Sequence, residues 1–196
     1  MKTNKKTAVK FAFLAGWAVA TVLVGGALTS FHQPFLAPEA KIVEIASHSN
    51  STRWRAVHFL SAGCGCSQKV MAHLLSRGLF RDLSEDVVMV DGMSPDPPDS
   101  EATIQRLRNA GFHVSHVSSK EIPVAYGLRG VPLLLFVAPN GGVVYIGGYG
   151  PDKYHLQDEY LYQQISAGET PKPYPIIGCA ISAKLKQRLD PFALKY

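Results

Sequence analysis

The chain has 196 residues, of which 46% are hydrophobic and 18% are charged. This composition can bury one core and excludes a disordered chain, and the length leaves little room for more than a single domain. The formal net charge is +5, but the four lysines among residues 1–10 leave only +1 for residues 11–196. The sequence therefore has no basic footprint for nucleic acid, and we expect no nucleic-acid partner.

The N-terminal segment predicts a membrane anchor. Residues 11–37 contain no Lys, Arg, Asp or Glu, and residues 11–29 form a nearly continuous apolar run. As a helix this run would cross a hydrocarbon core of about 30 Å. Because the lysines precede the run, the basic tail (1–10) should stay in the cytosol, the span (11–31) should cross once, and the rest should be exported. A cleaved signal peptide is the alternative, although the run is longer than is usual for one; a buried soluble helix is the third.

The exported part predicts an α/β domain. A tether over 32–50 contains two prolines, a domain follows over 51–168, and an extension over 169–196 begins with a Pro-rich stretch. Strands and helices alternate at first, and a Pro-Asn-Gly hairpin signal comes late, so the sheet should be mixed and flanked by helices. The expected strands cover 53–60, 87–91, 113–117, 133–138 and 142–146, and the expected helices cover 67–76, 99–110, 153–167 and 180–189.

Two of the three cysteines lie at the end of the first strand. Cys64-Gly65-Cys66 should stand at a helix N-terminus, where unpaired N–H groups and the helix dipole stabilise a thiolate. Gly65 lets the backbone bend, and bending within so small a ring predicts a strained disulfide that is more oxidising than a relaxed Cys-x-x-Cys. An exported compartment also lets disulfides persist.

The sequence resembles the thioredoxin family at two places. Residues 58–66 (HFLSAGCGC) are similar to the thioredoxin active-site stretch with one residue deleted between the cysteines, and residues 126–136 (YGLRGVPLLLF) are similar to a second thioredoxin segment. The resemblance implies a thioredoxin-like fold with a cis peptide bond at Pro132. It also implies that the backbone of Val131 binds the extended chain of a substrate. The anchored layout is closer to the membrane-tethered proteins of the TlpA type, which implies a bacterial inner membrane and a periplasmic domain.

Two further residues are candidates for the chemistry. His58 stands where thioredoxins keep a buried acid, and a histidine could transfer protons there, although a structural histidine is the more common case. Cys179, expected at the start of the last helix, could be a third redox thiol or a buried apolar side chain.

The leading hypothesis is a thiol-disulfide oxidoreductase acting on protein thiols and disulfides. Cys64, expected to be the more exposed thiol, would attack, and Cys66 would resolve the mixed disulfide. The direction depends on the redox potential and on an electron partner, and no cofactor or metal is expected. The alternatives are a Cu(I)-binding metallochaperone, since two thiolates can bind a soft metal, and a thiol peroxidase that needs one reactive cysteine.

Overall fold

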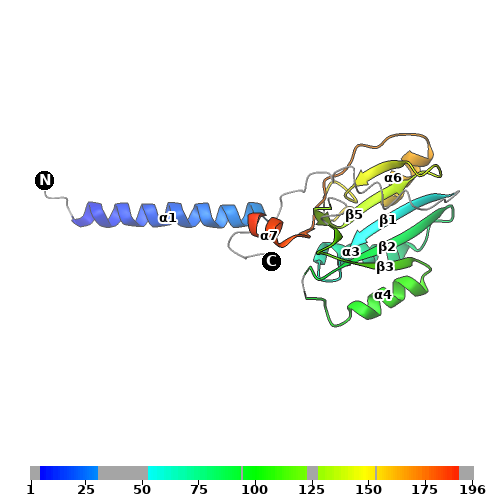
Figure 1. Cartoon of the computed structure of the whole chain (residues 1–196). Helices are drawn as coiled ribbons and strands as arrows, with labels where there is room; N and C mark the ends of the chain where they lie inside the picture. Colours follow the sequence, from blue (N-terminus) through cyan, green and yellow to red (C-terminus); the bar gives the residue numbers. More distant parts are fainter. Residues whose placement is uncertain (1–4, 31–52, 94, 123–127, 153, 190–196) are drawn as a thin grey trace. The chain divides into compact units, whose positions relative to one another are not determined.

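The computed structural model describes residues 5–30, 53–93, 95–122, 128–152 and 154–189. The chain divides into two compact units, residues 34–186 and residues 1–33 together with 187–196 (Figure 1). The expected tether (32–50) lies outside the described residues.

Helix α1 (Lys5–Ser30) has the length and the apolar composition of a membrane-spanning helix. Its stretch from Val9 to Gly26 is apolar, and none of it is buried in the protein. A helix exposed on all sides with no polar stripe is unsuited to water, whereas lipid would surround it at no cost. This confirms the N-terminal apolar helix. A signal sequence has the same length and composition, so the helix alone does not separate an anchor from a signal.

The larger unit is built on a five-stranded mixed sheet in the order β3-β2-β1-β5-β6. Strand β1 pairs in parallel with β2, and β2 with β3, whereas β5 is antiparallel to both β1 and β6. The expected mixed sheet is therefore confirmed, with the hairpin at one edge and the third strand at the other. The strands are β1 (Trp54–Leu60), β2 (Leu83–Asp91), β3 (His113–Ser118), β5 (Leu133–Val137) and β6 (Val143–Gly147).

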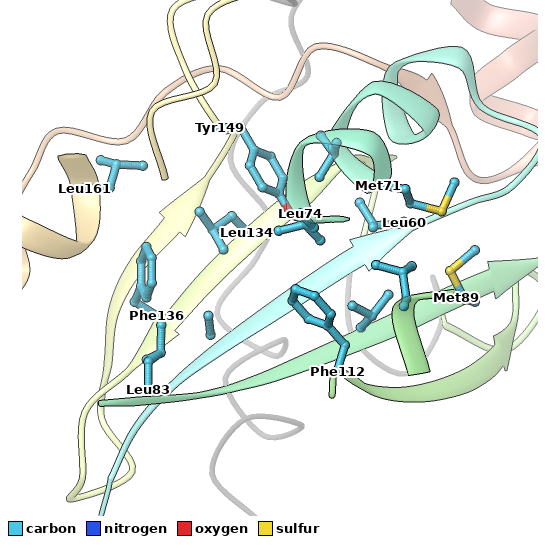
Figure 2. Packing of buried hydrophobic residues seen from close by; sticks show 14 of the residues in the cluster. Leu60, Met71, Leu74, Leu83, Met89, Phe112, Leu134, Phe136, Tyr149 and Leu161 are labelled. Atoms are coloured by element: carbon cyan, nitrogen blue, oxygen red, sulfur yellow. The ribbon is translucent and has the colours of Figure 1, made fainter. Parts of the chain in front are cut away.

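Three helices follow the expected positions, namely α3 (Gly65–Arg77), α4 (Ser100–Asn109) and α6 (Asp158–Ser166). Each contributes apolar side chains to one core cluster on the sheet, as Figure 2 shows for Met71 and Leu74 of α3 and Leu161 of α6. Alternate residues of β1 point to opposite faces, and they are buried on both. Both faces of the sheet are therefore covered.

Helix α6 is shorter than expected, because it begins at Asp158 rather than at residue 153. The Asp152 carboxylate accepts the backbone N–H groups of Tyr154 and His155, and the Gln157 N–H donates to the Tyr149 carbonyl. These N–H groups therefore bond in a turn, outside any helix, and the helix begins only after that turn.

The C-terminal extension departs further from the expectation. Cys179 and Ala180 form a short strand, β7 (Cys179–Ala180), which is antiparallel to β4 (Gly130–Val131). Helix α7 (Ala183–Leu189) begins three residues later, where the Ser182 hydroxyl accepts the Leu185 N–H. The prediction of a helix from residue 180 was wrong at its start, since these residues complete a β-ladder.

Candidate active site

Cys64 is the N-cap residue of α3 and follows β1 after a short turn (61–63). Its backbone is extended, its N–H donates to the Ser61 carbonyl, and its own carbonyl accepts the Gln68 N–H. The thiol donates to the Val131 carbonyl at 3.7 Å. Cys66 is the second residue of the helix. Both sulfurs thus belong to the first turn of α3, where the helix dipole favours a thiolate.

The expectation that Cys64 is the more exposed thiol was wrong. Cys64 is 1% exposed, whereas Cys66 and Cys179 are half-buried. The cause is the extension, because strand β7 lies along Val131, whose carbonyl accepts the Cys64 thiol. Local sequence patterns did not indicate that Cys64 would be buried by strand β7, which lies more than a hundred positions later in the chain.

The third cysteine joins the first two. The Cys179 and Cys66 thiols, acting as donors to the Cys64 sulfur, lower the pKa of Cys64, burial raises it, and the backbone and hydroxyl of Ser67 lower it further, to about 2. None of the three cysteines is joined to another by a disulfide. A stabilised Cys64 thiolate with two neighbouring thiols is a centre suited to thiol-disulfide exchange.

Ser67 was missed by the sequence reasoning. It lies in the first turn of α3 and is fully buried. Among the described residues, its hydroxyl is the one buried side-chain N or O atom that has no partner in hydrogen-bond geometry. Its position three residues after the N-cap is the signal that could have found it, since N-cap side chains interact with that position.

Val131 and Pro132 lie opposite the cysteines. The peptide bond between them is cis, the conformation that the resemblance implies. Pro132 and Cys66 both line a cavity of about 20 Å³, which is large enough for one water molecule. The backbone of Val131 faces Cys179 in the β4–β7 pair, so the edge that the resemblance reserves for a substrate is occupied by the chain itself.

His58 is fully buried in β1, with both ring nitrogens engaged. Nε2 lies 3.1 Å from the Glu85 carboxylate, and Nδ1 lies 2.7 Å from the Tyr149 hydroxyl. The carboxylate can only accept, so in the neutral ring Nε2 donates and Nδ1 accepts from Tyr149. Tyr149 also lines the cavity beside Cys66. The structure therefore connects His58 to the cysteine region through Tyr149.

A buried ionic network supports this histidine. Arg77 of α3 binds the carboxylates of both Glu85 and Asp158, and His73 contacts Asp158 at 2.7 Å. Burial raises the pKa of Glu85, but the hydrogen bonds from His58 and Arg77 lower it more, so the carboxylate stays ionised. Sequence reasoning assigned these residues no role, because their spacing along the chain gives no sign that they meet.

Within the described ranges, no group of three or more His, Cys, Asp or Glu side chains is arranged to hold a metal ion.

No protein-family model matches this chain, and no curated protein matches its sequence. Among solved structures, an uncharacterized conserved protein from Geobacillus kaustophilus matches with a TM-score of 0.53 at 17% identity, over 77% of this chain and 89% of that one. A secreted disulfide oxidoreductase from Mycobacterium tuberculosis, homologous to E. coli DsbE, matches with a TM-score of 0.42 at 14% identity, over 60% and 83%. The thioredoxin domain of a thiol-disulfide oxidoreductase from Bacteroides vulgatus matches with a TM-score of 0.39 at 17% identity, over 61% and 81%.

The order and directions of the five strands, with helices on the sheet, define a thioredoxin-like fold. The expected fold class is thus confirmed, including the apolar helix that precedes the domain.

Proposed function

We propose that this protein is a membrane-tethered, extracytoplasmic thiol-disulfide oxidoreductase that acts on protein substrates. The observation that carries the proposal is the position of Cys64 and Cys66 in the first turn of α3, with the Cys64 thiol against the carbonyl that precedes cis-Pro132. A favoured thiolate beside a strand edge provides both the nucleophile and a place for an extended peptide.

In the first step the Cys64 thiolate attacks one sulfur of a substrate disulfide. A mixed disulfide forms, and the other substrate sulfur leaves with the electron pair and takes up a proton. The low pKa of Cys64 keeps the nucleophile ionised without a separate base. Once strand β7 leaves Val131, the backbone of Val131 positions the substrate chain by strand pairing, in the manner of peptide addition to a sheet edge.

In the second step Cys66 attacks Cys64 and releases the reduced substrate. Cys66 must lose its proton first, and the one-water cavity that it shares with Tyr149 provides a route. Burial raises the pKa of Tyr149 well above its usual value, so its hydroxyl stays protonated and can pass a proton only in concert with His58. His58 therefore acts through Tyr149, and Glu85 fixes the orientation of its ring.

Two features support the location. Helix α1 has the length and composition of a membrane span, and the lysines precede it, which favours a cytosolic N-terminus and an exported domain in a bacterial inner membrane. The solved structures with a similar fold include a secreted disulfide oxidoreductase. An exported thiol-disulfide protein also needs a redox partner to restore its active state.

The test uses the full chain and three variants. We expect Cys64→Ser to lose all disulfide exchange with a disulfide-bonded protein substrate, and the double variant Cys66→Ser with Cys179→Ser to accumulate the mixed disulfide on Cys64. The exposed Ser76→Ala variant on the same helix is the matched control and should keep wild-type activity. Retained exchange in Cys64→Ser would refute the assignment.

Two further measurements separate the alternatives. A thiol peroxidase would retain peroxide consumption in Cys66→Ser, because one reactive cysteine is enough for that reaction. A Cu(I)-binding protein would hold the metal with the Cys64 and Cys66 thiols reduced, and Cu(I) would block their oxidation.

A further inference from the structure

The extension places an extended strand on the edge where a substrate chain would pair. Val131 lies opposite Cys179, Gly130 lies opposite Ala180, and the Ile181 N–H donates to the Arg129 carbonyl at 3.0 Å. An extended peptide that adds to a strand edge makes the same backbone bonds. Residues 178–180 therefore sit in the place of a substrate.

The fit of this segment depends on Gly178. A Cβ at this position would lie 1.9 Å from the Val131 carbonyl oxygen and 2.6 Å from Cδ of Pro132. Both atoms belong to rigid parts of the chain, so any other residue would force the segment away from the edge. The segment thus approaches Val131 and Pro132 as closely as a glycine allows.

The segment also brings a sulfur to the reactive thiol. Cys179 is paired with Val131, whose carbonyl lies 3.7 Å from the sulfur of Cys64, and Cys64 is 1% exposed. The Cys179 thiol is also near enough to lower the pKa of Cys64. A neighbouring strand that carries a cysteine beside the attacking thiol has the arrangement of an enzyme with its disulfide substrate. An external disulfide reaches Cys64 only when this strand moves aside.

We propose that Cys179 is an internal exchange partner of Cys64, delivered to it by residues 178–180 as a built-in substrate strand. This rests on the proposed function, which supplies the Cys64–Cys66 disulfide when a substrate disulfide is reduced. The Cys179 thiolate then attacks Sγ of Cys64, and a Cys64–Cys179 disulfide forms. The bond between Cys64 and Cys66 breaks, and Cys66 leaves with the electron pair and takes up the proton that Cys179 lost. No net oxidation occurs, and the reverse step restores the first disulfide.

The direct test is a Cys66→Ser variant of the full chain in detergent, treated with about 1 mM oxidised glutathione. This concentration is similar to the effective concentration of a flexibly linked partner, which Cys179 should at least equal. Cys64 attacks glutathione disulfide and releases one glutathione, and Cys179 displaces the second. Tryptic mass spectrometry should show residues 56–69 linked to residues 154–184 in more than half of the molecules. Persistent glutathione on Cys64, with Cys179 unlinked, would overturn the proposal.

The strand itself is tested by Gly178→Ala in the Cys66→Ser background. This change keeps both thiols but blocks the pairing with Val131, so the link should form at least about tenfold more slowly, as expected when positioning is lost. Lys172→Ala, an exposed change in the same extension, is the matched control and should leave the rate unchanged. An equal rate in Gly178→Ala would contradict delivery by the strand.

A measurement on the unmutated protein guards against misfolded variants. In the oxidised wild type, alkylation should label Cys66 in some molecules and Cys179 in others, and label on Cys179 alone would contradict the exchange. Failure of the proposed function gives a different result, namely a Cys64–Cys179 link in Cys66→Ser but no turnover of protein disulfides by the wild type. Turnover without the link refutes only the internal exchange.

Discussion

Ser67→Ala isolates one source of the reactivity of Cys64. The Ser67 hydroxyl is fully buried in the first turn of α3, and its interaction with the Cys64 sulfur is the smallest of the contributions that lower the pKa of that thiol. A hydrogen bond to a charged group contributes about 1.5–3 kcal/mol, and one pKa unit corresponds to about 1.4 kcal/mol. Because the hydroxyl lies outside ideal hydrogen-bond geometry, removing it should raise the pKa of Cys64 by about 1 unit or less.

The assay is the ultraviolet absorbance of the thiolate during acid titration of the full chain, with Cys64→Ser subtracted to isolate one sulfur. The hydroxyl has no partner in hydrogen-bond geometry among the described residues, so its loss leaves no buried group without its partner. Ser76→Ala in the last turns of α3 is exposed and should leave the titration unchanged. An unchanged pKa in Ser67→Ala, or the same rise in Ser76→Ala, would refute the reasoning.

Three further changes probe the proton route, the ionic network and the core. Tyr149→Phe removes the hydroxyl between His58 and the cavity beside Cys66, so it should slow the release of substrate from the mixed disulfide and shift the pH profile of that step, while the first attack by Cys64 stays unchanged. Stopped-flow kinetics would measure each step, and an equal slowing of both would contradict the proton route. Arg77→Met leaves the buried Glu85 and Asp158 carboxylates unpaired and should lower the free energy of unfolding by about 3–5 kcal/mol, against almost no change for Arg108→Met in an exposed ion pair. Both carboxylates have a lowered pKa in the folded state, so this contribution is present above about pH 4 and is lost as the pH falls further. Denaturation at a series of pH values should show the difference in the free energy of unfolding between wild type and Arg77→Met becoming smaller in acid, and a constant difference would contradict this. Leu74→Ala should cost about 2–5 kcal/mol in chemical denaturation and Leu79→Ala far less, because Leu74 is fully buried and Leu79 is 42% exposed; equal costs would contradict the assigned core.

The sheet and its helices were predictable because their signals are local. The alternation and apolar runs of β1, β2 and β5 and the Pro-Asn-Gly turn before β6 depend on neighbours in the sequence. Gly141 in that turn has φ +81°, and the Asn140 side chain accepts the Gly142 N–H, as the turn signal requires. Boundaries were less predictable where side chains intervened, as Asp152 does before α6.

The candidate site was predictable only in part. The positions of Cys64 and Cys66 in the first turn of a helix followed from the order of strand, cysteines and helix. The place of Cys179 did not, because a two-residue strand such as β7 has no periodicity, and its partner β4 lies about fifty residues earlier. The burial of Cys64 follows from that same pairing, so the error about its exposure and the error about the last helix have one cause.

The measurement that tests the central claim most directly is the redox equilibrium of the full chain in glutathione buffers, with the thiols trapped and identified by mass spectrometry. The wild type and Cys179→Ser should both form a reversible disulfide between Cys64 and Cys66, at a potential above that of thioredoxin, about −270 mV. If Cys64 and Cys66 stay reduced across the buffer series in both proteins, the account of this site as a redox-active Cys-Gly-Cys centre is contradicted. A potential at or below that of thioredoxin would contradict the prediction of a strained, easily reduced disulfide.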